Sequence, residues 1–142
     1  MKKIILAACV AMVTMSSCQQ KSTKDATQVQ QYAEEAIKVH DEIMPQISHF
    51  DRATLKIDSI LENLGSIAQK DKSVDTAAVK ADLETLKANL ENATDNMMSW
   101  MKDYAPDSTD VAYQKAEVEK VKAMKKQFED VSLESNTKLG KF

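Results

Sequence analysis

An apolar residue recurs at alternating steps of four and three between Val29 and Leu64, and this repeat constrains the fold more than any other feature of the sequence. Eleven positions keep the 3.5-residue period and nine of them are apolar: Val29, Ala33, Ala36, His40, Ile43, Ile47, Phe50, Thr54, Ile57, Leu61 and Leu64. This is the period of a helix that packs lengthwise against other helices. The repeat therefore predicts a long helix from about residue 26 to residue 64.

Pro45 lies inside this predicted helix. Proline removes a backbone donor, clashes with the preceding turn and disfavours the helical conformation of Met44. The apolar repeat nevertheless passes Pro45 without a change of phase, whereas a loop would reset it. We therefore expect one continuous helix that is kinked at Pro45 and ends where Gly65 supplies a C′ cap.

Two shorter stretches have the same helical periodicity. Asp75 is a suitable N-cap for a helix over residues 76–104. Asp107, with Asp110 three residues later, resembles an acidic capping box and begins a third helix over residues 108–137. Short links favour antiparallel neighbours. The predicted fold class is all-α, an antiparallel three-helix bundle with long, coiled-coil-like helices.

The scarcity of turn-forming residues supports this fold class. The chain has two glycines and two prolines in 142 residues, which leaves little material for the tight turns of a multi-stranded sheet. Phosphate-binding and dinucleotide-binding loops need several glycines close together, so these sites are not expected either.

The first 18 residues resemble a bacterial lipoprotein signal. Lys2 and Lys3 precede an apolar run of twelve residues, 4–15, which is too short to span a bilayer and fits a secretory signal. The following Ser16-Ser17-Cys18 resembles a lipobox, which implies cleavage after residue 17 and acylation of Cys18, palmitate being a typical chain. Gln19 is similar to the residue that favours sorting to the outer membrane in enterobacteria. The resemblance implies a lipid-anchored protein of the cell envelope, at the outer membrane and facing the periplasm.

Cleavage changes the chemistry of the mature chain, which would consist of a tether over residues 18–26 and a bundle over residues 27–142. Removing residues 1–17 takes away Lys2 and Lys3 and leaves 17 basic and 22 acidic side chains, a net charge of −5. An acidic envelope protein is a poor candidate for nucleic-acid binding. Because Cys18 would be acylated, neither a disulfide nor a thiolate metal site is expected in the mature chain.

Two short motifs hold most of the unusual side chains, HDEIMP at residues 40–45 and MMSWM at residues 97–101. In an antiparallel hairpin, residues equally distant from the turn face each other, which pairs His40 with Trp100. The same reasoning brings Tyr113 of the third helix to this level. We therefore expect one cluster that contains His40, Met44, Met97, Met98, Trp100 and Met101, with Tyr113 nearby.

Copper(I) binding and packing both explain this cluster. Thioethers and imidazole are ligands that Cu(I) accepts, and His40 with Met44, like Met97 with Met101, are spaced i, i+4 on a helix. Methionine also fills irregular gaps, such as those beside a proline kink, and packs well against an indole. In the packing interpretation His40 hydrogen-bonds a neighbouring acid or carbonyl, although Asp41 and Glu42 are expected to point away from its face.

As a pair, HDEIMP and MMSWM resemble a group of short helical bacterial lipoproteins, some of which are labelled "viral A-type inclusion protein". This resemblance implies a helical lipoprotein and brings no activity and no catalytic residues with it.

No set of nucleophile, base and orienting group can be assembled from residues that a bundle would bring together, so we do not expect an enzyme. Alternating charges on the third helix, Glu117 and Lys120 among them, predict a solvated helix face. His49 lies off the apolar repeat and is expected at the surface. Two functional hypotheses remain: a structural or partner-binding module, which includes self-association, and a periplasmic Cu(I) carrier.

Overall fold

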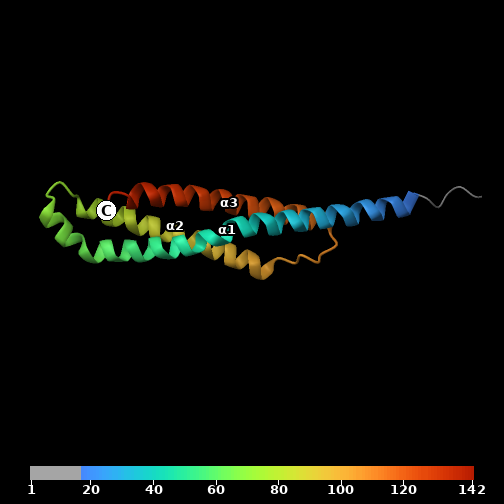
Figure 1. Cartoon of the computed structure of the whole chain (residues 1–142), viewed down its shortest axis with the longest axis horizontal. Coiled ribbons are helices and arrows are strands. Elements are labelled where there is room, and N and C mark those ends of the chain that lie inside the picture. The colour runs from blue at the N-terminus through green and yellow to red at the C-terminus, as the bar shows by residue number, and fades with distance from the viewer. Residues whose placement is uncertain (1–16) are drawn as a thin grey trace, which may run out of the picture.

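The protein is a bundle of three long helices. A computed structural model describes residues 17–142, and the first 16 residues, which contain most of the predicted signal peptide, lie outside the described part. The helices are α1 (Ser17–Lys70), α2 (Thr76–Asp103) and α3 (Val111–Leu139), and residues 17–142 contain no strand. Figure 1 shows the three helices side by side in an elongated molecule. The prediction of an all-α three-helix bundle is confirmed.

Contacts between helices define how they run. Asp58 of α1 pairs with Lys87 of α2, and the ring of His40 lies near that of Trp100. Higher residue numbers in α1 therefore lie beside lower residue numbers in α2. The contacts between α1 and α3 keep the same order along both helices: Glu35 with Lys122, Glu42 with Lys125, and Lys56 with Leu139. The chain thus runs along the bundle, returns and runs along it again (Figure 1).

Helix α1 is longer at both ends than the predicted range of 26–64. It continues through Gly65, so the expected C′ cap there is wrong. The apolar stripe explains the continuation, because Ile67 still packs against the core after Leu64, and this burial offsets the roughly 1 kcal/mol that a helical glycine costs. At the other end, the residues interpreted as a tether, 18–26, belong to α1.

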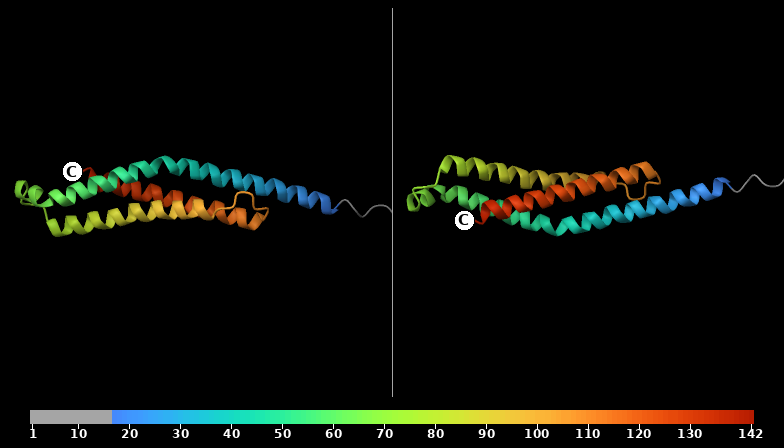
Figure 2. Two further views of the ribbon diagram at one scale, coloured as in Figure 1. Left: turned by 90° about the horizontal axis from the view of Figure 1, so that it is seen from below. Right: turned by 90° about the horizontal axis from the view of Figure 1, so that it is seen from above.

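Pro45 lies within α1, which has no loop at this position. The expectation of one continuous helix through the proline is therefore confirmed. Figure 2 shows that the ribbon of α1 bends near its middle. A local kink at Pro45 itself stays a prediction.

Aspartate side chains cap the starts of α2 and α3. Asp75 accepts hydrogen bonds from the backbone N–H groups of Ala77 and Ala78, as the sequence predicted. Asp110 makes the equivalent contacts with Ala112 and Tyr113. The third helix therefore begins at Val111 and not at 108, and Asp107 is not its cap. The longer connection shifts α3 relative to the predicted register.

The apolar faces of all three helices meet in one continuous core. Phe50 of α1 stacks on Phe128 of α3 with ring centroids 4.8 Å apart, and both side chains are buried. The other large, fully buried apolar residues form a row along the bundle: Ile43, Ile57, Leu83, Leu86, Leu90, Met97, Val118 and Val121. Burial of such side chains contributes about 1.5–3 kcal/mol each and dominates the stability of the fold.

The N-terminal part of α1 extends past the other two helices. Figure 1 shows it projecting beyond the connection between α2 and α3, at the opposite end from the C-terminus. Residues 23–28 are all exposed to solvent. No helix among residues 17–142 is both long enough and apolar enough to cross a membrane.

Candidate functional site

The two sequence motifs meet where His40 of α1 approaches Trp100 of α2. Their ring centroids are 5.8 Å apart and the ring planes are inclined by 32°. Trp100 is buried between the helices, as predicted. The pairing of His40 with Trp100, obtained from equal distances to the turn, is confirmed.

His40 has one ring nitrogen in a polar contact and one without. Its Nδ1 lies 3.0 Å from Oδ1 of Asp41, the adjacent residue. The expectation that Asp41 points away from His40 is therefore wrong, because an aspartate side chain can fold back along the helix surface to its neighbour. Nε2 is buried and has no hydrogen-bond partner among the described residues. The ring thus presents an unsatisfied nitrogen to the interior.

The methionines of the two motifs lie in different environments. Met97 is fully buried in the core, and Met44 is partly buried against it. Met98 and Met101 are 50% and 40% exposed. Met97 and Met101, although spaced i, i+4, therefore differ in exposure, since Met101 lies at the edge of the α1–α2 contact. We define the Met98 patch as four apolar residues at this edge that are exposed or partly buried: Ile37, Met44, Met98 and Met101.

A buried carboxylate beside Trp100 was not predicted. Oε2 of Glu117 accepts a hydrogen bond from the indole Nε1 of Trp100 at 2.9 Å. Oε1 accepts from the ammonium group of Lys120 at 2.6 Å, and this hydrogen bond raises the pKa of Lys120. Glu117 is only 4% exposed, so its assignment to a solvated face was wrong. The signal was the indole itself, because a buried N–H needs an acceptor.

Aromatic rings continue from Trp100 to the end of α2. Tyr104 stacks on Trp100 at 4.6 Å, and the ring of Tyr113 lies 6.4 Å from that of Tyr104. Burial raises the pKa of the Tyr104 hydroxyl, which donates to Oε1 of Gln114 at 2.8 Å. Tyr113 therefore lies near the cluster, as expected, and Glu117 is the α3 residue that accepts the hydrogen bond of the Trp100 indole.

Gln114 organises the connection between α2 and α3. It is fully buried, and its Nε2 donates to the backbone carbonyls of Ala105, Pro106 and Ser108 at 3.0–3.2 Å. The Tyr113 hydroxyl accepts from the backbone N–H of Ala105. The residues of this connection are exposed or partly exposed, and these bonds pair several of their backbone groups with the ends of α2 and α3. This role was not predicted from the sequence, because nothing in the helical periodicity indicates which polar residue contacts a connection between helices.

Among residues 23–142, no three side chains of the His, Cys, Asp and Glu types are grouped so that they could hold a metal ion. His49 is exposed, as expected, and its Nδ1 lies 2.7 Å from Nη2 of Arg52. Cys18 lies in the first turn of α1. No family model matches the chain, and no curated protein or solved structure matches it either.

Proposed function

We propose that the protein is a lipid-anchored, non-enzymatic helical module of the bacterial cell envelope, located at the outer membrane and facing the periplasm, which binds a protein partner or a second copy of itself. The observation that carries this proposal is the projection of α1 beyond the bundle (Figure 1). If Cys18 is acylated, this projection connects the anchor to the bundle as a continuous helix.

The projecting segment is suited to act as a spacer. Its residues 23–28 are exposed and the sequence over 19–28 is polar throughout apart from Ala26, so the segment does not need to pack against α2 or α3. At about 1.5 Å per residue, residues 17–28 add about 18 Å of helix. A helical spacer would hold the bundle away from the lipid surface, where its sides are accessible to a partner.

The Met98 patch is the surface that we propose for partner binding. Lys87, which pairs with α1, lies three helical turns before Met98, so both residues are on the α1 side of α2. His40 lies beside Trp100, and Ile37 precedes His40 by about one helical turn. The patch thus collects exposed apolar side chains from two helices, and flexible methionines suit an adaptable binding surface.

A photo-crosslinking amino acid at Met101 is expected to capture a discrete partner in intact cells. Leu133 on α3 is the matched control, because it is apolar and 69% exposed but lies outside the patch. The product is identified by mass spectrometry, which also separates a dimer of this chain from a complex with another protein. Identical products from positions 101 and 133 would contradict the patch as the interface.

Copper(I) binding is the second candidate function, and His40 provides the observation that favours it. Its buried Nε2 has no hydrogen-bond partner, and Met44 and Met97 belong to the same core cluster. A Cu(I) ion bound there would take an imidazole nitrogen and thioether sulfurs as ligands, with Trp100 alongside. The predicted set of His40, Met44, Met97 and Met101 requires Met101 to turn inward from its exposed position.

If this copper site exists, anaerobic Cu(I) quenches the fluorescence of Trp100, the single tryptophan of the chain. The variant with Met97→Leu and Met101→Leu should lose the quenching, while each volume-conserving change costs less than about 1.5 kcal/mol of stability. Met98→Leu removes a neighbouring thioether outside the predicted ligand set and serves as the control. Equal quenching in all three proteins, or none in the parent, removes the copper hypothesis.

A further inference from the structure

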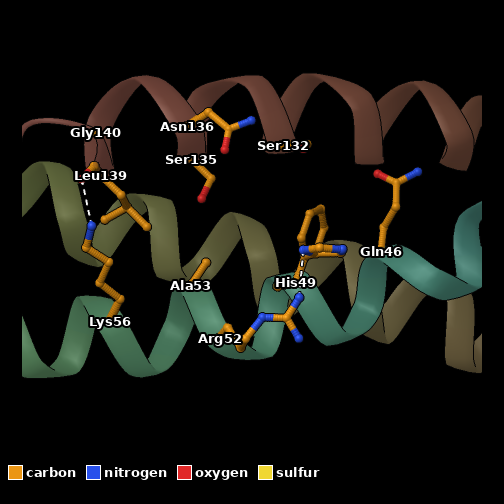
Figure 3. A pocket seen from close by; sticks show the side chains of 11 residues that line it. Gln46, His49, Arg52, Ala53, Lys56, Ser132, Ser135, Asn136, Leu139 and Gly140 are labelled. Atoms are coloured by element: carbon orange, nitrogen blue, oxygen red, sulfur yellow. Dashed lines mark hydrogen bonds between the residues drawn. The ribbon is translucent and has the colours of Figure 1, made fainter.

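A groove of about 700 Å³ runs between α1 and α3, on a different side of the bundle from the Met98 patch. Figure 3 shows residues of α1 along one wall and residues of α3 along the other. The lining is made up of Gln46, His49, Phe50, Arg52, Ala53 and Lys56 from α1 and of Ser132, Ser135, Asn136, Leu139 and Gly140 from α3. Its volume is within the usual range for small-molecule sites.

The groove exists because α3 presents small polar side chains to α1 near its C-terminal end. Phe128 fills the space between the two helices by stacking on Phe50. One and two turns later the facing residues are Ser132, Ser135 and Asn136, which are too short to reach α1. The apolar groups at the bottom are Ala53 and the buried side chains of Phe50 and Leu139.

Positive charge is concentrated in this groove. Arg52 and Lys56 line it and no carboxylate does, although acids outnumber bases in the chain by 22 to 19. Among residues 23–142, neither cation forms an ion pair. Arg52 contacts Nδ1 of His49, and Lys56 donates to the backbone carbonyl of Leu139 at 3.0 Å (Figure 3). Most of their N–H donors therefore have no protein acceptor.

Ser135 adds a hydrogen-bond donor to the groove. The residue is only 6% exposed, and its hydroxyl makes no hydrogen bond to another residue among 23–142. Figure 3 shows this hydroxyl directed from α3 toward α1, into the groove. Of the described side-chain atoms, the one that is fully buried without a partner is Nε2 of His40, so the Ser135 oxygen is accessible from the groove. An unpaired hydroxyl that points into a cationic groove is suited to donate to an anionic oxygen there.

We propose that this groove binds the phosphate or carboxylate group of a small ligand with a short apolar chain. Arg52 and Lys56 hold the oxyanion, Ser135 donates a third hydrogen bond, and the apolar chain lies on Ala53 and Leu139. The groove lies toward the end of the bundle where the C-terminus is found, away from the N-terminal end of α1 (Figure 1), which favours a soluble ligand over a lipid headgroup. The oxyanion site itself does not depend on the proposed anchoring or partner binding, whereas the preference for a soluble ligand over a lipid headgroup rests on the proposed anchor at Cys18.

Nuclear magnetic resonance tests the proposal directly, because Arg52 is the only arginine in the sequence and its side-chain Nε–Hε signal needs no assignment. Hexyl phosphate and hexanoate are titrated into the protein, and we expect a saturable shift of this signal for at least one of them. Ser135→Ala and Lys56→Gln should each weaken binding about tenfold, the scale of one charge-assisted hydrogen bond. Lys70→Gln is the matched control, since it removes one exposed lysine charge outside the groove.

Two further titrations, with inorganic phosphate and with lipid vesicles, distinguish the kinds of ligand that could carry the oxyanion. Weaker binding of inorganic phosphate than of hexyl phosphate supports a ligand with an apolar chain, and equal binding contradicts that part of the proposal. Vesicles containing phosphatidylglycerol should not shift the Arg52 signal; if they do and the soluble probes do not, the proposed soluble ligand is wrong. Absence of saturable binding at millimolar probe, or an equal loss of affinity in Lys70→Gln, overturns the site. Thermal unfolding of each variant checks that its fold is intact.

Discussion

Replacing Cys18 with serine is expected to abolish incorporation of labelled palmitate and to move the protein out of the membrane fraction. A serine hydroxyl is almost the same size as the thiol but cannot form the thioether to the lipid. The anchor's strength comes from its acyl chains, at about 0.8 kcal/mol for each buried CH₂ group. Losing these chains therefore changes the distribution of the protein almost completely, as fractionation after a carbonate wash and immunoblotting would measure.

The other cysteine of the chain provides the control for this experiment. Cys9 lies in the apolar run of the predicted signal and would be removed with it, so Cys9→Ser should leave both labelling and localisation unchanged. A Cys18→Ser protein that is still labelled and as firmly bound as its parent would mean that the lipobox interpretation is wrong. The twelve-residue apolar run of an uncleaved signal is too short to span the bilayer, so a carbonate wash distinguishes such retention from lipid anchoring.

The parts of the fold that were predictable follow from helical periodicity alone. The repeat from Val29 to Leu64 determined the helix and its continuity through Pro45, and the positions of Asp75 and the intervening loop determined which residues of α1 and α2 face each other. His40 and Trp100 meet because both lie at the same distance from that loop. Gly65 was misjudged because a glycine suits a helix C′ position but does not by itself end a helix whose apolar stripe continues to Ile67.

The polar residues of the core could not be found from periodicity. Glu117 and Gln114 are of residue types that are mostly exposed in proteins. Their burial depends on partners that only the packed structure provides: the indole of Trp100, the hydroxyl of Tyr104 and the carbonyls of the α2–α3 connection. The register of α3 depended on its true start at Val111, which an alternative cap at Asp107 obscured. The hydrogen bonds of Glu117 with Trp100 and of Gln114 with Tyr104 therefore could not be predicted from the spacing of apolar residues.

Trp100→Ala is expected to lower the free energy of unfolding by about 3–5 kcal/mol, as large-to-small changes of buried aromatic residues do. Trp100 is buried against His40 and Tyr104, and its removal also takes the indole donor from Glu117. Since whole domains are stable by only about 5–15 kcal/mol, this change would remove a large share of the total. Urea denaturation followed by circular dichroism measures it without the lost fluorophore, and a cost below about 1 kcal/mol would contradict the packing seen at this level of the bundle.

The hydrogen bond between Trp100 and Glu117 can be separated from the packing of the indole by a double-mutant cycle. Glu117→Leu leaves the indole N–H buried without an acceptor, and Trp100→Phe leaves the carboxylate without its buried donor, so each single change should be destabilising. In the double variant neither group is left unpaired. Its cost should therefore be smaller than the sum of the single costs by about 1.5–3 kcal/mol, the range for hydrogen bonds to charged groups.

Lys120→Ala is the control for the other contact of Glu117: because Lys120 is 62% exposed, its loss should cost at most about 1 kcal/mol. Additive costs in the cycle would mean that Glu117 is solvated in solution and that Trp100 stabilises the bundle through its ring contacts alone.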